Sequence, residues 1–143
     1  MDYKRQDVEL NQQTLILIKP DGIRRGLIGE IISRFEKRQL SIIDVMMIKL
    51  TREVATSLYS PHKEKPFFTE LLEYMTSGPV IKLIVEGELA IEVVRSMIGS
   101  TNSLQALSGT IRGDFGLGLT ENVIHASDSS SSFDREKQIL DAI

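Results

Sequence analysis

One histidine stands in a sequence context that suits nucleophilic chemistry. In the segment 122–129, His125 directly follows the apolar pair Val123 and Ile124, and small or polar residues follow it. This order predicts a buried strand that ends at the histidine, then a turn and a helix. An imidazole held from behind and open in front suits a nucleophile. The alternative is an ordinary loop histidine without a chemical role.

A carboxylate near the C-terminus is expected to face that histidine. Ser131 or Ser132 can cap a last helix, in which Glu136 falls on the apolar stripe. A carboxylate that points inward costs several kcal/mol unless it finds a partner, and His125 is the best local partner. An exposed acid in the first turn is the alternative for Glu136. The apolar members of this stripe are Phe133, Leu140 and Ile143.

Three cations and a hydroxyl are candidates for binding phosphate. Lys19 ends the β-favouring run 14–19, and Pro20-Asp21-Gly22 then predicts a turn. Arg95 lies off the apolar stripe of its predicted helix, while Thr101 and Arg112 belong to a long irregular stretch, which in a compact domain is usually functional or disordered. Charged guanidinium groups and hydroxyls are suitable donors to phosphate. A snorkelling lysine and a solvated arginine are the alternatives at the first two positions.

Several other kinds of chemistry are excluded or disfavoured. The chain has no cysteine, and its two histidines are a poor basis for a zinc site. It lacks the phosphate-binding loop of P-loop NTPases and the motif set of protein kinases. A Ser-His-Asp hydrolase built from His125, Ser127 and Asp128 is disfavoured, because neighbours in sequence seldom converge as a triad.

Composition indicates one globular domain. The chain has 143 residues, 41% of them hydrophobic and 26% charged, with a net charge of −3. This charge does not suggest general binding to nucleic acid. Because no apolar run approaches ~20 residues and the N-terminus lacks the apolar core of a signal peptide, we expect no membrane partner and a cytoplasmic location.

The predicted elements give an α+β fold. Residues 1–13 are expected to be a flexible N-terminal arm or a short edge element, and 14–143 a single domain. With one helix set aside, the order resembles a βαββαβ ferredoxin-like sandwich: a four-stranded antiparallel sheet, helices on one face, and a long irregular loop over 99–114 before the last strand. The predicted strands are 14–19, 41–50, 80–85 and 123–124; the predicted helices cover 27–38, 51–59, 67–75, 90–97 and the segment after 131.

Taken together, several long segments resemble the nucleoside diphosphate kinase family, in the family's order and without obvious gaps from about residue 14 to about residue 140. Several motifs in order are more specific than any one of them. The segments that carry the resemblance are 14–22, 25–32, 65–68, 75–80, 109–115 and 122–129.

The resemblance implies a fold, a reaction and a set of site residues. Members of this family transfer the γ-phosphate of a nucleoside triphosphate to a nucleoside diphosphate in two steps, through a phosphohistidine. His125 matches the nucleophile, which reacts at Nδ1, and Glu136 matches its hydrogen-bonding glutamate; Lys19 and Tyr59 complete the catalytic set. Phe67 matches the platform on which the base stacks. The substrate-binding residues that it implies are Lys19, Tyr59, Phe67, Arg95, Thr101, Arg112, Leu119, Asn122 and Ser127.

The resemblance also implies a cofactor and partners. Mg²⁺ would arrive with the nucleotide, with no direct protein ligand and an approach to Asp128 through water. The partners would be nucleoside di- and triphosphates, together with further copies of the chain in a hexamer or a tetramer.

Three departures from the family pattern bear on these expectations. Ala126 stands where glycine is frequent, which we expect to be tolerated unless the backbone there has a positive φ. Ser103 and Ser108 replace two usual prolines in a loop that lies between subunits in the family. With the end of the chain at Ile143, soon after the last helix, they favour a tetramer or a weaker hexamer.

Two other functions are compatible with the same fold. One is a regulatory module that binds nucleotides without turnover. The other is a phosphorelay protein that passes a phosphoryl group from His125 to a protein. The intact set of His125, Lys19, Arg112 and Glu136 argues against the first.

Overall fold

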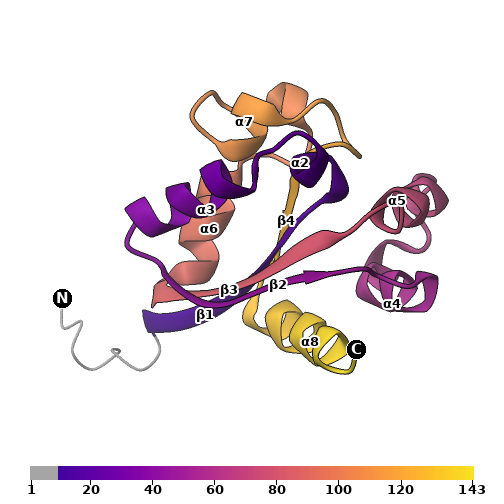
Figure 1. Ribbon diagram of the computed structural model, residues 1–143, viewed down its shortest axis with the longest axis horizontal. Helices are drawn as coiled ribbons and strands as arrows, with labels where there is room; N and C mark the ends of the chain where they lie inside the picture. Colours follow the sequence, from indigo (N-terminus) through magenta and orange to yellow (C-terminus); the bar gives the residue numbers. More distant parts are fainter. Residues whose placement is uncertain (1–9) are drawn as a thin grey trace.

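The computed structural model describes residues 10–143, which form one four-stranded antiparallel sheet and the helices packed on it (Figure 1). The strands lie in the order β2-β3-β1-β4. The strands are β1 (Asn11–Ile18), β2 (Ser41–Ile48), β3 (Val80–Glu88) and β4 (Ile124–Ala126). The helices are α2 (Pro20–Arg24), α3 (Ile28–Lys37), α4 (Arg52–Leu58), α5 (Phe68–Met75), α6 (Ala90–Ile98), α7 (Ile111–Phe115) and α8 (Ser130–Asp141), with 3₁₀ turns η2 (Ser60–His62) and η3 (Ser103–Gln105).

This topology confirms the predicted ferredoxin-like sandwich. β1 lies inside the sheet, between β3 and β4, and both pairings are antiparallel. The run 14–18 is fully buried, as its continuous apolar sequence predicts for a central strand. The C-terminal end of β1 therefore lies beside the short strand β4, which carries His125.

Helices cover both faces of the sheet, so the expectation of helices on one face was wrong. Ile16 and Ile18 pack with α3 and α6, whereas Leu15 and Leu17 pack with α4, α5 and α8. Figure 1 shows α3 and α6 on one side of the sheet and α8 on the other. Alternate residues of a strand point to opposite faces, so an unbroken apolar run requires a cover on each side.

The N-terminal boundary also differs from the prediction. β1 begins at Asn11, so residues 11–13 of the predicted arm belong to the sheet, where they pair with the end of β3. This pairing extends β3 beyond the predicted end at residue 85 as far as Glu88, and the side-chain amides of Asn11 and Gln13 also donate to the Glu86 carboxylate. The remainder of the predicted arm, 1–9, lies outside the described residues.

Several short helices replace predicted turns or loops. The Pro20-Asp21-Gly22 segment is the start of α2, because proline suits the first position of a helix. The stretch 99–114 is more regular than predicted, since it holds η3 and most of α7, and the Thr110 hydroxyl caps α7 by accepting from Gly113 N–H. α8 is capped one turn earlier than predicted, by Ser129, which accepts from Ser132 N–H.

Candidate active site

A cavity of about 510 Å³ opens at the end of the sheet where β1 finishes and β4 begins. Of the predicted site residues, only Ser127 does not line it, because Ser127 is fully buried behind the cavity wall. The predicted residues that line the cavity are Lys19, Tyr59, Phe67, Arg95, Thr101, Arg112, Leu119, Asn122, His125 and Glu136.

His125 is the middle residue of β4, which continues to Ala126, one residue beyond the predicted end at the histidine. It pairs with Leu17 of the central strand, which holds its backbone in the sheet. The predicted strand start at Val123 was wrong because Val123 has a φ of 75°, a left-handed conformation that is strained for a β-branched residue. Its carbonyl turns to accept from Lys19 N–H at 2.8 Å, which joins the two strand ends.

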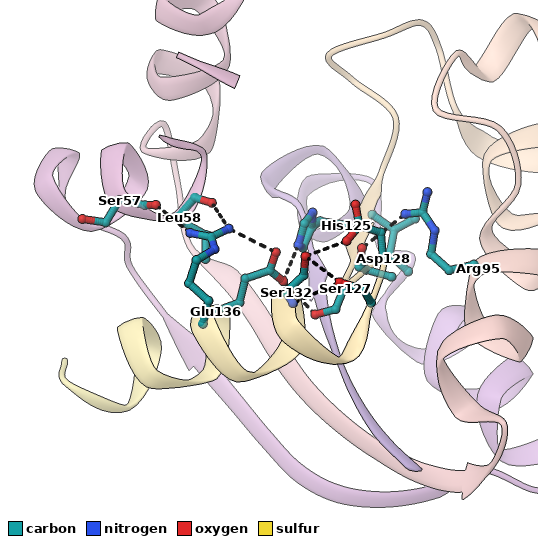
Figure 2. Close-up of polar contacts among 12 residues, drawn as sticks. Ser57, Leu58, Arg95, His125, Ser127, Asp128, Ser132 and Glu136 are labelled. Carbon is teal, nitrogen blue, oxygen red and sulfur yellow. Dashed lines mark hydrogen bonds and ion pairs between the residues drawn. The ribbon is translucent and has the colours of Figure 1, made fainter. Parts of the chain in front are cut away.

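The rear of the His125 ring is occupied by a carboxylate, as predicted. His125 Nε2 lies 2.9 Å from Glu136 Oε1, which also accepts from Ser127 Oγ at 2.7 Å (Figure 2). Burial raises the pKa of Glu136, but hydrogen bonds from His125 and Ser127 outweigh it and leave this pKa below its usual value. An ionised carboxylate only accepts, so Nε2 carries the proton and Nδ1 keeps a lone pair.

The helix that carries Glu136 follows the predicted stripe except at its end. Leu140 is buried and Phe133 is half-buried, whereas Ile143 lies beyond α8 and is exposed, so its place on the stripe was wrong. Glu136 itself is 4% exposed, which rules out the exposed-acid alternative.

A tyrosine closes another side of the imidazole. The Tyr59 ring meets the His125 ring edge to face, with centroids 5.6 Å apart and an interplanar angle of 74°. Its hydroxyl is buried and has no partner among the described residues. Burial, followed by the Glu136 charge, raises the pKa of Tyr59 above its usual value, so the hydroxyl is a neutral donor that faces the cavity region.

Lys19 directly follows β1, at the end of the sheet where β1 pairs with β4, and it is almost completely buried. Its ammonium donates to Asn122 Oδ1 at 2.7 Å, and Asn122 in turn donates to the Thr101 carbonyl at 2.9 Å. Burial, and then the charge of Arg112, lower the pKa of Lys19 to about 7, although Asp21 opposes this shift. A bound anion would restore the charged form.

The two arginines are held by backbone carbonyl groups. Arg112 donates to Gly99 O at 3.1 Å and to Ile124 O at 2.6 Å, and Arg95 donates to Ala126 O at 3.3 Å. Burial, and then the charge of Arg95, lower the pKa of Arg112 to about 10. In the part of the chain that the structure describes, no carboxylate forms a salt bridge with Lys19, Arg95 or Arg112.

Apolar side chains form the outer rim of the cavity. Phe67 is 38% exposed, and Leu119 is 59% exposed. Exposed apolar residues that line a cavity are available to a flat ligand, whereas core residues are not. Phe67 is therefore not an ordinary core residue.

Several further residues line the cavity, among them His62, Lys65 and Arg135, which were not predicted as site residues; the first two lie in the turn-rich connector 61–66. His62 has a buried Nδ1 without a partner among the described residues, and Lys65 lies 5.7 Å from the centre of the Phe67 ring. Burial, and then Lys65, lower the pKa of His62. The sequence did contain an indication that Lys65 belongs to the site, because Lys65 lies two residues before Phe67 in the segment 65–68.

The cavity offers few metal ligands from the protein itself. Among residues 10–143, no group of three or more His, Asp or Glu side chains is arranged to hold a metal ion. Asp128 lines the cavity; a hydrogen bond from Ser132 Oγ, 2.6 Å from Asp128 Oδ1, lowers its pKa below the usual value. It is an ionised carboxylate that could contact a hydrated cation.

The backbone accommodates Ala126, Ser103 and Ser108, the residues that depart from the family pattern. Ala126 does not have a positive φ, so a side chain is accommodated there as expected. The Ser103 N–H, which proline would lack, donates to Gly118 O at 3.3 Å. Ser108 forms a bridge with Thr110 before α7.

No helix in the described part of the chain is both long and apolar enough to span a membrane.

Comparisons with known proteins agree with this geometry. The family model described as nucleoside diphosphate kinase matches residues 12–140. The protein named nucleoside diphosphate kinase from Staphylothermus marinus is 57% identical over 129 residues, which cover 90% of this chain and 92% of that protein. Its counterpart from Saccharolobus islandicus is 54% identical over 129 residues, 90% of this chain and 94% of that protein.

Solved structures share the fold. The nucleoside diphosphate kinase of Aquifex aeolicus matches with a TM-score of 0.88 and 41% identity, over 91% of this chain and 94% of that one. The enzyme of Halobacterium salinarum, solved in complex with CDP, matches with a TM-score of 0.88 and 39% identity, over 90% of this chain and 86% of that one. The chain belongs to the nucleoside diphosphate kinase family, a family of phosphotransferases that act on nucleotides.

Proposed function

We propose that this chain transfers the γ-phosphate of ATP to nucleoside and deoxynucleoside diphosphates through a phosphohistidine on His125. One observation carries the proposal: His125 presents its Nδ1 towards a cavity whose three cations have no described carboxylate partner. Buried or half-buried cations without a salt-bridge partner favour an anionic ligand, and a polyphosphate is the anion that such a cavity could use.

The transfer would proceed in two displacements. The Nδ1 lone pair attacks the γ-phosphorus, the bond from that phosphorus to the β–γ bridging oxygen breaks, and the nucleoside diphosphate leaves with the bond electrons. A second nucleoside diphosphate then takes the phosphoryl group back from Nδ1. The ring becomes cationic when Nδ1 bonds to phosphorus, and Glu136 stabilises this charge while Nε2–H stays bonded to it.

The cations would neutralise the phosphates during each displacement. Phosphoryl transfer depends mainly on positioning and charge stabilisation, so Arg95 and Arg112 would hold the phosphate oxygens in line with Nδ1. Thr101 and Tyr59 would add hydroxyl donors. Lys19 would regain its proton in the presence of the anion, since its pKa of about 7 results from burial and from the nearby charge of Arg112.

Mg²⁺ fits this site as a companion of the nucleotide. Mg²⁺ is usually bound through one or two carboxylates plus substrate phosphates, and Asp128 is the ionised carboxylate in position. The ion would supply charge neutralisation at the phosphate oxygens. The protein's part would be to accept its water shell at Asp128.

Recognition of the nucleoside would rest on shape and not on the base identity. Phe67 offers an exposed ring for stacking, worth roughly 1–3 kcal/mol and available to any base. Leu119 would cover the other side of the base, and Lys19 and Asn122 would bind ribose hydroxyls. The relative from Halobacterium salinarum was solved with CDP, a ligand of this class.

A two-stage labelling experiment tests the proposal. The protein is incubated with γ-labelled ATP and Mg²⁺, and acid-labile label on the protein is measured before and after GDP is added. The proposal expects stoichiometric labelling that leaves as GTP. His125→Ala is expected to take up no label, with His62→Ala as the matched histidine control that is still labelled.

The same experiment separates the other two functions. A regulatory nucleotide-binding module would take up no label at all. A phosphorelay protein would keep its label when GDP is added. Turnover in the His125→Ala variant would contradict the assigned nucleophile.

We further infer that the chain forms a homo-oligomer, a hexamer or a tetramer. β2 is an edge strand of the sheet, and large apolar side chains on it are about half exposed. A second exposed apolar set lies on the loop around α7. The exposed residues are Ile43, Val45, Met46 and Met47 on β2, and Leu104, Leu107 and Leu117 on the loop.

Such exposed apolar sets mark interfaces between proteins. Light scattering is expected to give a mass of four or six times 16.1 kDa. A monomeric mass would contradict this inference. The cytoplasmic location stays a prediction, which fractionation of the source cells would test.

A further inference from the structure

An arginine beside the site joins two helices that both support His125. Arg135 of α8 donates from Nη1 to Ser57 O at 3.0 Å and from Nη2 to Leu58 O at 3.1 Å. Both carbonyls belong to the last turn of α4, and Figure 2 shows them facing α8. The guanidinium of Arg135 therefore links α8 to the C-terminal end of α4 through two hydrogen bonds.

The end of α4 lacks a cation of its own. The last carbonyl groups of a helix have no partner inside the helix, and they form the negative end of its dipole. α4 has no basic residue in its last turn. Arg135 supplies both the donors and the positive charge, so it stabilises the α4 terminus while it fixes the distance between α4 and α8.

Each end of this contact is followed directly by a residue that touches His125. Glu136 comes after Arg135, and its Oε1 binds Nε2 of His125. Tyr59 comes after Leu58, and its ring packs edge to face on the imidazole. A shift of α8 relative to α4 would move both supports of the ring at once.

Arg135 also faces the second oxygen of Glu136. The distance from Arg135 Nη2 to Glu136 Oε2 is 3.7 Å, whereas Oε1 is held by His125 and Ser127. The side chain of Arg135 is 36% exposed, so this ion pair by itself is weak. Its value is geometric, since it orients the carboxylate with Oε1 towards the imidazole.

We propose that Arg135 is a positioning residue for phosphoryl transfer: it clamps α8 to the end of α4 and so holds Glu136 and Tyr59 against the imidazole of His125. The proposal rests on the proposed function of His125. A lysine would not replace it fully, because an ammonium cannot bind two carbonyls with a planar fork.

Two measurements on Arg135→Gln test the clamp. The first is the rate of His125 phosphorylation in a single turnover at saturating ATP, which we expect to fall about 10- to 100-fold, as small misplacements of reacting groups do. The second is the ¹⁵N-edited NMR signal of the His125 Nε2–H, in a chain with only two histidines. We expect this proton to exchange with water about tenfold faster in the variant.

Lys137→Gln is the matched control. It removes the same charge from the same helix, where Lys137 pairs with Asp141 and with no other carboxylate of residues 10–143. It is expected to keep the wild-type phosphorylation rate and NMR signal. Arg135→Lys is expected to show intermediate values, and it serves in place of Arg135→Gln should the latter not fold.

Several results would overturn the clamp. Equal losses of phosphorylation rate in Arg135→Gln and Lys137→Gln would show that the effect comes from the net charge of the helix and not from the clamp. An unchanged phosphorylation rate at saturation with weaker ATP binding would make Arg135 a ligand contact. A wild-type NMR signal in Arg135→Gln would also refute it. Failure of the wild-type chain to take up label would instead contradict the proposed function, while the NMR comparison would remain valid.

Discussion

The two sides of the His125 ring differ in how their polar groups are paired. Behind the ring, Glu136 accepts from both His125 and Ser127, and every partner comes from the protein. In front, Lys19, Arg95 and Arg112 bond neutral amide and carbonyl oxygens, and among the described residues no carboxylate lies within salt-bridge distance of them. The charged group behind the ring has its partners within the protein, whereas the cations in front lack an anionic partner at salt-bridge distance.

The lack of salt-bridge partners in front of the ring costs folding stability, and this cost indicates that the cations serve to bind a ligand. Charges buried without a partner destabilise a fold, and the lowered pKa values of Lys19 and Arg112 express that cost. The rear of the ring, in contrast, is a set of ordinary stabilising contacts. Changes in front should therefore alter nucleotide binding and charge neutralisation, while changes behind should alter the orientation of the imidazole.

The largest effect is expected in front of the ring. Arg95→Gln should reduce kcat/KM by about 10²–10³-fold, because a fixed donor to the charge that develops in the transition state is lost. High salt screens charge, so it should reduce the effect of the substitution on nucleotide binding more than its effect on the rate of the chemical step. Steady-state kinetics measure it, with Arg52→Gln, an exposed cation at the start of α4, as the control. Equal losses in both variants would contradict the distinction.

A smaller effect is expected behind the ring. Glu136→Gln keeps the shape but removes the charge that accepts from Nε2–H. kcat should fall about 10–100-fold, comparable with the loss of the partner that orients a metal-bound histidine. KM for the nucleotide should change little, because Glu136 faces the imidazole and not the phosphates. A rise in KM at constant kcat would sink this assignment.

The charge imbalance in front also predicts a pH dependence of stability. The pKa of Lys19 is lowered from 10.5 to about 7, so between these pH values the unfolded chain binds more protons than the folded one. Stability of the free protein should therefore rise with pH in this interval, by at most about 1.4 kcal/mol per unit.

Urea unfolding of the wild type and of Lys19→Met at pH 7 and pH 9 measures this effect. Comparison with the variant removes the contributions of Asp21, Arg112 and the other titrating groups near Lys19. The wild type should gain stability relative to Lys19→Met as the pH rises. A difference that is constant with pH would show that Lys19 is not desolvated as the structure indicates.

The smallest effect is expected from Ser127→Ala. It removes one of two donors to Glu136 Oε1 and leaves His125 as the other. The loss of one hydrogen bond to a charged group costs about 1.5–3 kcal/mol of stability, and the phosphorylation rate should fall less than tenfold. Thermal unfolding and single-turnover labelling measure the two quantities. A larger loss than in Glu136→Gln would reverse the proposed ranking.

Much of the site was predictable because its signals are local. The apolar run before Lys19 and the inward position of Glu136 follow from periodicity over a few residues. The roles expected for Tyr59, Phe67 and Leu119 came only from the resemblance, since their own surroundings in the sequence indicate no ligand. His62 and Lys65 were missed because a turn-rich connector looks the same whether it faces a cavity or solvent.

The amino-acid sequence by itself determined the order of strands and helices, the family, and the types of side chain available for phosphoryl transfer. Those properties depend on patterns between near neighbours in the chain. Only the tertiary structure decided that both faces of the sheet are covered, that Val123 turns the chain with a positive φ, and that Arg135 binds the end of α4. These features depend on contacts between residues far apart in sequence, whose geometry no local pattern contains.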